Sequence, residues 1–316
     1  MALEFEQPII ELEARIRELR EYADAGGVDL SDEIGLLERK LEQLQRETFG
    51  RLSRWQRVQL ARAPGRPTTL DIAQHVFEDF IELHGDRAFA DDPAVVAGLA
   101  RFRGRSVVIV GHQKGKTTKE NIHRNFGMPH PEGYRKAMRM MDLADRFGFP
   151  LISLIDTPGA YPGVSAEERG QAWVIAQSIQ RMGRLGVPAI AVILGEGGSG
   201  GALAIGVGNR VLIMENAWYS VISPESCAAI LWRDAAQAEQ AAEALKLTAR
   251  DLRELGVVDR VVPEPGGGAH RHPERAMEEL ARALAEELAE LEPLSPEELR
   301  KDRYRRFRGM GAVRVE

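Results

Sequence analysis

A run of glycines directly after an apolar segment is the feature that most constrains this fold. Seven of the fourteen residues at positions 195–208 (GEGGSGGALAIGVG) are glycine, and they follow residues 188–194 (PAIAVIL). This order is typical of a buried strand that ends in a turn and continues into a short helix. Because glycine has no side chain, the turn exposes bare backbone N–H groups at the end of a sheet. Such groups bind an anion, or stabilise an oxygen that becomes anionic during a reaction.

Length and composition exclude several classes of protein. The chain has 316 residues, enough for one large domain or two modest ones, and its formal charge of −6 gives no support for nucleic-acid binding. The single cysteine, Cys227, excludes an internal disulfide framework and a multi-cysteine zinc site, and we expect it to be a small buried apolar residue. No apolar run approaches the roughly 20 residues that span a membrane, and the first residues lack the pattern of a signal peptide. We therefore expect a soluble, cytoplasmic protein.

Two helices are predicted near the N-terminus. Apolar residues recur every three or four positions in residues 8–20 and 31–47, as in amphipathic helices. Gly26 and Gly27 separate the two helices, and Ser31 is the predicted N-cap of the second. We interpret residues 1–62 as a helical N-terminal segment, either a hairpin packed on another part of the molecule or a solvated arm. A linker is expected at residues 63–69 (APGRPTT).

The chain changes character over residues 70–262. Short, continuous β-rich runs alternate with helical segments, the pattern of an α/β domain whose strands are buried on both faces. A capping box of Ser165 and Glu168 is predicted to begin one of the helices. The expected strands are 106–110, 151–155, 189–194, 211–214 and 219–222, and the expected helices are 132–147, 165–184 and 234–254.

Residues 263–316 form a predicted C-terminal helical tail. A helix is expected near residues 273–291, and Ser295 with Glu298 opens a last helix. That helix ends in a basic stretch, residues 300–308 (RKDRYRRFR). Clusters of this kind are mostly solvated helix faces or contacts with a partner.

Two nucleotide-binding motifs occur, and each is incomplete. Residues 111–117 (GHQKGKT) have three residues between the first glycine and the Gly-Lys pair, whereas a phosphate-wrapping P-loop needs four. Residues 195–200 match the dinucleotide-binding fingerprint, with Glu215 about 20 residues later. The helix that must follow this fingerprint has to fit within residues 201–209, which glycines already interrupt. We therefore disfavour both classes.

A serine hydrolase is a third alternative. Residues 197–201 (GGSGG) formally match a nucleophile elbow centred on Ser199, and Asp259 and His270 follow in the expected order. The match is partly a consequence of the glycine content. Ser199 is as easily a helix N-cap, and the polar surroundings of His270 are typical of a surface turn.

Six longer motifs, taken in order, are much more specific. Together they resemble the family of α subunits of the bacterial acetyl-CoA carboxylase carboxyltransferase, over nearly the whole chain. Residues 116–123 (KTTKENIH) depart from the family pattern, in which we expect a more charged string. The motifs are residues 111–115, 125–139, 156–163, 167–171, 195–208 and 220–232.

The resemblance implies a fold and an assembly. The fold would be crotonase-like, with repeated β-β-α units in a twisted spiral and an added N-terminal helical part. The family forms a heterotetramer of two α and two β chains that is active only when both are present. The zinc ribbon and the acetyl-CoA site belong mainly to the β chain. Biotin is carried by a separate biotin carboxyl carrier protein, ATP is used by a separate biotin carboxylase subunit, and no cofactor, membrane or nucleic acid is expected to attach to the α chain.

The resemblance also implies a reaction. In this family the carboxyl group moves from N1 of carboxybiotin to the methyl carbon of acetyl-CoA, which gives malonyl-CoA, the first committed step of fatty acid synthesis. Negative charge develops on the ureido oxygen of biotin as the carboxyl group leaves, and preorganised N–H donors lower such a barrier by about 3 kcal/mol each. The backbone N–H groups of Gly200 and Gly201 are the implied donors. The released N1 takes the methyl proton, so no side-chain nucleophile is required.

Other site residues follow from the same resemblance. The biotin and substrate pocket is expected to include two groups of residues, Gly159, Ala160 and Tyr161, and Gly197, Gly198, Ser199 and Ala202. A structural turn is the alternative for the first group. Contacts with the phosphates of CoA are expected from Lys114, Lys116, Lys119 and Arg124, with a solvated loop as the alternative. Residues 223–226 (SPES) close the pocket floor or pack in the core. A scaffold without catalytic activity is the remaining class, and the exposed amides of the glycine turn argue against it.

Overall fold

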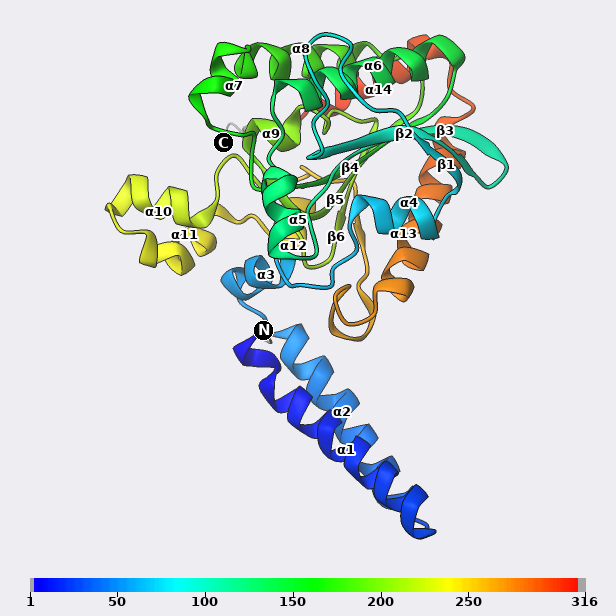
Figure 1. Ribbon diagram of the computed structural model, residues 1–316, viewed down its shortest axis with the longest axis vertical. Coiled ribbons are helices and arrows are strands. Elements are labelled where there is room, and N and C mark those ends of the chain that lie inside the picture. The colour runs from blue at the N-terminus through cyan, green and yellow to red at the C-terminus, as the bar shows by residue number, and fades with distance from the viewer. Residues whose placement is uncertain (1–2, 312–316) are drawn as a thin grey trace, which may run out of the picture.

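Three layers of secondary structure form the body of the molecule, and a helical hairpin projects from it (Figure 1). The computed structural model describes residues 3–311. Residues 1–2 of the predicted N-terminal segment and 312–316 of the predicted tail lie outside the described residues. None of the helices within 3–311 is sufficiently long and apolar to cross a membrane.

The central layer is a mixed sheet of eight strands. Its order is β1-β2-β3-β4-β5-β6-β8, and β7 pairs with the end of β5. The pairs β1–β2 and β2–β3 are antiparallel, whereas every pair from β3 to β8 is parallel. The strands are β1 Glu78–Glu82, β2 Val95–Phe102, β3 Arg105–His112, β4 Leu151–Thr157, β5 Ala189–Gly198, β6 Arg210–Met214, β7 Trp218–Ser220 and β8 Arg260–Val262.

Helices cover both faces of this sheet, as parallel strands require. One face carries α6 Pro131–Phe147, α8 Gln171–Arg184, α9 Ser199–Leu203 and α14 Pro296–Arg308, and the other carries α4 Thr69–His75 and α13 Pro273–Leu291 (Figure 1). A separate lobe contains α10 Pro224–Trp232 and α11 Ala238–Leu245. The remaining helices are α1 Gln7–Gly26, α2 Ser31–Gly50, α3 Arg54–Ala61, α5 Thr118–His123, α7 Val164–Glu168 and α12 Ala249–Glu254, with 3₁₀ turns at Glu4–Glu6, Asn125–Gly127, Ala235–Gln237 and Pro265–Gly267.

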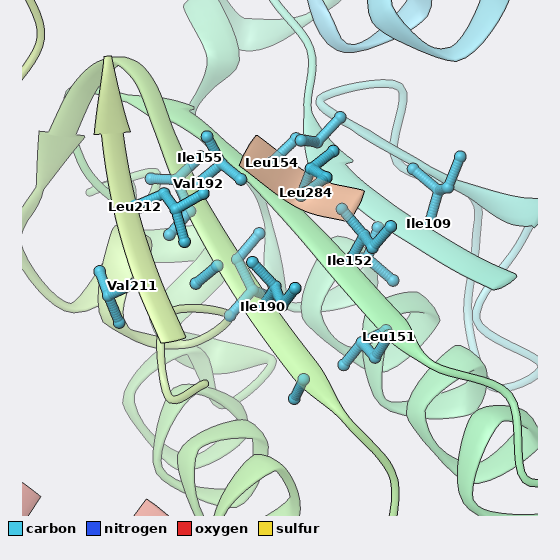
Figure 2. Close-up of a cluster of buried hydrophobic side chains, with 14 of the residues drawn as sticks. Ile109, Leu151, Ile152, Leu154, Ile155, Ile190, Val192, Val211, Leu212 and Leu284 are labelled. Carbon is cyan, nitrogen blue, oxygen red and sulfur yellow. The ribbon is translucent and has the colours of Figure 1, made fainter. Parts of the chain in front are cut away.

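The core lies on both sides of the central strands. Figure 2 shows aliphatic side chains of β3, β4, β5 and β6 packed beside Leu284 of α13. Ile109, Ile152 and Ile190 are completely buried, and each such side chain contributes about 1.5–3 kcal/mol to the free energy of unfolding. Helices α13 and α14 contribute to the same hydrophobic cluster as the strands, so the predicted C-terminal tail packs directly on the sheet.

Many of the predicted elements are confirmed. The five expected strands are present, as are the N-terminal helices, α6 and α13. The capping box at the start of α14 also forms, with the Ser295 hydroxyl accepting from the N–H of Glu298. Cys227 is buried, as expected. These elements have strong local signals, namely continuous apolar runs, a helical apolar period or a cap.

Several predictions about the elements are wrong. The helices expected at 165–184 and 234–254 are each divided, because Gly170 (φ 83°) and Lys246 (φ 49°) adopt left-handed backbone conformations. Ser31 and Ser165 are not N-caps, since Leu30 and Gly163 occupy those positions. Strands β1, β2 and β8 and the short helix α3 were not predicted from the sequence. The three strands are short or contain charged residues, and pairing with a neighbouring strand decides their conformation. Helix α3 has only eight residues, which is little more than two turns.

Among residues 3–311, the hairpin of α1 and α2 contacts the body through its base (Figure 1). There His270 Nε2 lies 2.9 Å from Glu6 Oε1, and Arg271 pairs with Glu13. Phe49 packs so closely on Gly267 that a Cβ at that glycine would lie 2.2 Å from the ring. The hairpin is therefore anchored at one end while its tip, including the half-exposed Val28, extends away from the sheet.

A buried ion pair joins the predicted linker to the end of β8. Arg66 donates to both carboxylate oxygens of Glu264 at 2.7 and 2.8 Å, and the N–H groups of Asn216 and Ala269 also donate to this carboxylate. Burial by itself would raise the pKa of Glu264. The Arg66 charge and the hydrogen bonds outweigh burial and lower this pKa to about 2. The linker is therefore fixed to the body by a charged pair.

This ion pair should make the free energy of unfolding depend on pH. A carboxyl group whose pKa falls from 4.5 in the unfolded chain to about 2 in the folded chain contributes about 3 kcal/mol above pH 4.5, and that contribution is lost as pH falls through 2. We expect Glu264→Gln to lower the free energy of unfolding at pH 7 and to approach the wild type near pH 2. Chemical unfolding from pH 7 to 2 tests this. The exposed control Glu254→Gln should stay within about 0.5 kcal/mol at every pH.

Candidate functional site

The candidate site lies where β3, β4 and β5 end, on the edge of the sheet that parallel strands share. The register places Gly111 beside Leu154, and Thr157 beside Gly197. Strand β5 pairs with β6 up to Ile193, and its last residues pair with β7 instead. Because β5 changes partner at this point, its glycine-rich end separates from β6 and leads directly into α9.

Two loops approach each other closely at this end of the sheet. A Cβ added at Gly198 would lie 2.1 Å from the carbonyl oxygen of Pro158, and one added at Gly201 would lie 2.5 Å from the amide nitrogen of Ala160. A side chain at either glycine would therefore force the two loops apart. A Cβ at Gly200, by contrast, would lie at an ordinary 3.5 Å from Ile175. The glycine turn, residues 198–201, is therefore in backbone contact with residues 158–160.

The amides of this turn are free of internal bonds. Gly200 and Gly201 provide early N–H groups of α9, which have no acceptor within a helix. Across residues 3–311, neither group donates to a backbone carbonyl or to a side chain. Gly200 is half-buried and Gly201 is buried. The preceding Ser199 is exposed and has φ 55°, a strained conformation for a residue with a side chain, as is common at functional turns.

A buried network of charges lies beside the turn. Lys114 Nζ donates to Asp156 Oδ1 and to Glu196 Oε2, both at 2.7 Å. Arg62 Nε donates to the other oxygen of Glu196 at 2.6 Å, and Arg62 also pairs with Glu225 of α10. Burial lowers the pKa of Lys114 and raises that of Glu196, but the opposite charges outweigh burial in both. Lys114 and Glu196 therefore stay ionised.

This network forms one wall of a cavity of about 360 Å³. The other walls come from the linker after α3 and from the loop before α5. Phe126, half-exposed at φ 55°, also lines the cavity, and Gly127 packs against Lys114 and Asp156. The lining residues are Ala61, Arg62, Ala63, Pro64, Gly65, Arg66, Thr68, Lys114, Gly115, Lys116, Asn121, Phe126, Asp156, Pro158 and Glu196. Pro158 therefore belongs both to this cavity and to the contact with the glycine turn.

One histidine at the end of β3 is completely enclosed. His112 is 1% exposed, and neither ring nitrogen has a hydrogen-bond partner among the described residues. Burial lowers the pKa of His112 to about 3, and the nearby Lys114 charge lowers it too. The ring is therefore neutral at physiological pH. Sequence reasoning missed His112, Arg62, Glu196 and Phe126 as residues of this region. Glu196 stands within the glycine-rich run itself, whereas only the folded chain brings Arg62 and Phe126 to the same cavity.

The structure places the expected phosphate contacts in different surroundings. Lys114 is already held by two carboxylates, and Lys116, which also lines the cavity, pairs with Asp71. Arg124 donates to the carbonyl oxygen of Pro93 at 2.8 Å. Lys119 is exposed on α5 and is not among the residues that line the cavity. The four cations therefore do not form a single cluster.

Some of the other expected pocket residues contact the glycine turn, and others pack against different parts of the molecule. Tyr161 packs its ring 4.2 Å from that of His130, and its N–H donates to Pro129. Ala202 is fully buried beneath the turn. Gly197 faces Tyr219, and a Cβ added at Gly197 would lie 2.8 Å from the tyrosine ring. Gly159 and Ala160 are the residues of this group that directly contact the glycine turn.

The arrangement does not assemble the alternative sites. Asp259 accepts from Arg306 and from Val211, whereas His270 pairs with Glu6, so these two residues are not partners in a triad with Ser199. Helix α9 has five residues, fewer than a dinucleotide-binding helix needs. Within residues 3–311, no group of three or more His, Cys, Asp and Glu side chains is arranged to hold a metal ion. The amides of the glycine turn remain as the chemically available groups.

The sequence matches one family model along nearly its whole length. Residues 2–311 match the family described as acetyl co-enzyme A carboxylase carboxyltransferase-like. The chain is 72% identical, over 99% of both chains, to the acetyl-coenzyme A carboxylase carboxyl transferase subunit alpha of Thermus thermophilus. It is 60% identical, over 96% of both chains, to the protein with the same name in Deinococcus radiodurans.

Solved structures show a similar fold at low sequence identity. The transcarboxylase 12S structure superposes with a TM-score of 0.55 at 24% identity, covering 69% of this chain and 42% of that one. The β subunit of Pseudomonas aeruginosa geranyl-CoA carboxylase superposes with a TM-score of 0.56 at 18% identity, covering 76% of this chain and 46% of that one. These likenesses confirm the predicted crotonase-like fold.

Proposed function

The chain belongs to the family of acetyl-CoA carboxylase carboxyltransferase α subunits, and from that premise we propose how its residues contribute to the reaction. It is a transferase component, and with a β chain it would move the carboxyl group of carboxybiotin to acetyl-CoA and so form malonyl-CoA. The observation that carries this proposal is the pair of unbonded amides at Gly200 and Gly201. They lie beside a second loop, residues 158–160, that is held at backbone contact distance.

The glycine turn fits the ureido group of biotin. A ureido oxygen needs N–H donors and a close approach to the backbone, and the turn offers both because Gly198 and Gly201 have no side chains. The neighbouring groups are suitable for a developing negative charge. Lys114 is neutralised by Asp156 and Glu196, so it holds the loops together without competing for the oxygen.

The proposed role of this chain is to hold the ureido group of biotin and to polarise its oxygen. Carboxybiotin, when bound, would supply the carboxyl group and, at its N1, an acceptor for the proton of the acetyl methyl group. The amides of Gly200 and Gly201 would hold the ureido oxygen and stabilise its negative charge, and each donor would lower the barrier by about 3 kcal/mol. Gly159, Ala160 and Tyr161, together with Gly197, Gly198, Ser199 and Ala202, form the surrounding pocket. The amides are fixed before the reaction, so no reorganisation is needed when charge develops.

The remaining components would come from other chains. The thioester oxygen of acetyl-CoA would be held by the β chain, which would also contain the zinc site, and the active assembly would contain two α and two β chains in the cytoplasm. A carrier protein would deliver biotin after an ATP-dependent carboxylase has loaded it. Among the expected phosphate contacts, Lys116, Lys119 and Arg124 stay proposed, whereas the ion pairs of Lys114 make it unsuitable for a phosphate.

Reconstitution tests this function directly. We expect the full-length chain alone to show no carboxyltransferase activity, because only one of the two oxyanion sites is present in it. Mixing it with a β chain should produce decarboxylation of malonyl-CoA with free biotin as the acceptor. Activity from the isolated chain would contradict the proposal, as would an assembled but inactive complex.

The serine of the turn separates this mechanism from hydrolysis. Ser199→Ala removes the hydroxyl and keeps every backbone N–H group, so we expect the turnover number of the reconstituted enzyme to stay within about threefold of wild type. A nucleophilic serine would instead lose activity by several orders of magnitude. The measurement is the initial rate of malonyl-CoA decarboxylation at saturating biotin.

A further inference from the structure

One face of α8 is connected to both loops of the candidate site. Gln171, Ile175 and Ser178 are spaced by four and then three positions, so their side chains lie on the same side of the helix. Gln171 and Ser178 are buried. The helix is fixed to the body in turn, because its Val174 and Met182 side chains are also buried. A fixed helix face of this kind can hold two loops at a defined separation.

Gln171 holds the loop at residues 158–161. Its Nε2 donates to the carbonyl oxygen of Tyr161 at 3.0 Å and to that of Pro129 at 2.8 Å. The Tyr161 N–H donates to the same Pro129 carbonyl at 3.0 Å. Both protons of the Gln171 amide are therefore used, and both backbone polar groups of Tyr161 are bonded. The loop cannot change its distance from α8 without breaking these bonds.

Ser178 holds the glycine turn through α9. Its hydroxyl donates to the Ala204 carbonyl at 2.6 Å, and the Ala204 N–H donates to the Gly200 carbonyl at 2.9 Å. Ile175 lies beside Gly200, where an added Cβ would be 3.5 Å away, and packs in the same small hydrophobic cluster as Ala160 and Ala204. A series of hydrogen bonds therefore runs from α8 to the residue whose N–H is the proposed donor to biotin.

The two loops do not fix each other. Across residues 3–311, no hydrogen bond joins residues 198–201 to residues 158–161. They meet only in van der Waals contact, and Gly198 and Gly201 have no side chains that could interlock with the opposite loop. Their separation must therefore be set by a third element, and α8 is bonded to both.

We propose that Gln171 and Ser178 are positioning residues, which together set the separation between residues 158–161 and the glycine turn. This role rests on the proposed function of the turn, and it deepens that function by naming what fixes the width of the pocket for the ureido group. N–H donors stabilise a developing charge only if they are in place before the charge develops. A displacement of about 1 Å can cost as much as about 100-fold in rate.

Two substitutions remove the bonds with little change in shape. Gln171→Met removes both N–H donors and keeps a side chain of the same length, and Ser178→Ala removes only the hydroxyl. In the full-length chain reconstituted with its β partner, we expect each to lower the turnover number for malonyl-CoA decarboxylation by about 10- to 100-fold. The KM for malonyl-CoA should change less than about threefold, because the loss is in transition-state stabilisation and the β chain would hold the thioester.

Ser153 offers a matched control for the serine variant. It is fully buried in β4, and its hydroxyl also donates to a backbone carbonyl, that of Ile190 at 3.4 Å. Ser153→Ala should lower the melting temperature about as much as Ser178→Ala, but it should leave turnover within about twofold of wild type. A double variant of Gln171→Met and Ser178→Ala should lose less than about threefold beyond the more damaging single change, since either change already releases the shared separation.

The outcomes separate this inference from the proposed function. Turnover within threefold of wild type in Ser178→Ala would overturn the positioning role, and so would an equal loss of turnover in Ser153→Ala. A double variant that shows the product of the two single losses would also overturn it, because the two bonds would then act separately. If Gln171→Met fails to assemble, Ser178→Ala and its control decide the question. An inactive wild-type complex would instead reject the proposed function of the turn.

Discussion

Gly201→Ala is expected to lower the turnover number of the reconstituted enzyme by at least about 100-fold. The added Cβ would lie 2.5 Å from the Ala160 nitrogen and 2.6 Å from the Gly159 carbonyl carbon, so the two loops must separate. Both contacts are with backbone, which has no rotamer that could relieve them. A displaced amide no longer points at the ureido oxygen, and loss of one such donor costs about 10²–10³ in rate. Initial rates of malonyl-CoA decarboxylation measure this effect.

A second glycine provides the matched control. Gly183 lies in α8, and a Cβ there would have no atom within 4 Å. Gly183→Ala should therefore keep full activity and slightly raise the melting temperature, since alanine favours a helix. Size-exclusion chromatography should show an intact complex for both variants. Near-normal turnover of an assembled Gly201→Ala enzyme would remove the oxyanion role from the turn.

Lys114→Met is expected to lower the free energy of unfolding of the full-length chain by about 3–5 kcal/mol at pH 7.5. The methionine side chain is unbranched and one atom shorter, so the substitution keeps most of the packing but leaves Asp156 and Glu196 buried without their shared cation. Arg62 still pairs with Glu196, so Asp156 is the carboxylate that loses its paired cation. Lys114 also supports Gly127, whose Cβ would lie 2.9 Å from the lysine side chain, so the loop that carries Phe126 should loosen too. Chemical unfolding measures the loss.

The pH dependence of this variant gives an independent test. In the wild type the lowered pKa of Glu196 contributes stability above its ordinary value of 4.5, and this contribution is lost as pH falls through the folded value. Without Lys114, the pKa of Glu196 rises because only Arg62 then opposes the effect of burial, and protonation of this carboxyl group removes part of the uncompensated charge in the variant. The difference between wild type and variant should therefore shrink from pH 7.5 to pH 5. A constant difference would contradict the assignment.

A surface lysine shows what an exposed pair contributes. Lys116 pairs with Asp71, but its side chain is 62% exposed. Lys116→Met should lower the free energy of unfolding by less than about 1 kcal/mol. A similar loss of free energy of unfolding in Lys114→Met and Lys116→Met would mean that burial of the Lys114 network does not cause the destabilisation.

Local patterns predicted much of the fold. The continuous apolar runs of β4 and β5 specify strands buried on both faces, and the residues at 7–26, 31–50 and 273–291 have the helical apolar period. Strands β1, β2 and β8 lack such a signal, since they are short or contain charged residues. Their conformation depends on hydrogen bonds to neighbours far away in the sequence.

The site was predictable to a smaller extent. The position of the glycine turn follows from its composition, and the longer motifs identify the family. The charged network does not follow, because Arg62 and Glu225 approach Glu196 from α3 and α10. The expectation that Lys114 is one of four phosphate contacts considered its charge alone, whereas the structure pairs it with two carboxylates.

The sequence by itself determined where bare amides occur, since only glycine permits the backbone approach seen at residues 198 and 201. The tertiary structure decided which amides stay unbonded, which charges cancel and that His112 is buried. The physical reason is that a turn or an apolar run is a local property of the backbone. Ion pairing and burial instead depend on distances between atoms that only packing of the whole chain fixes.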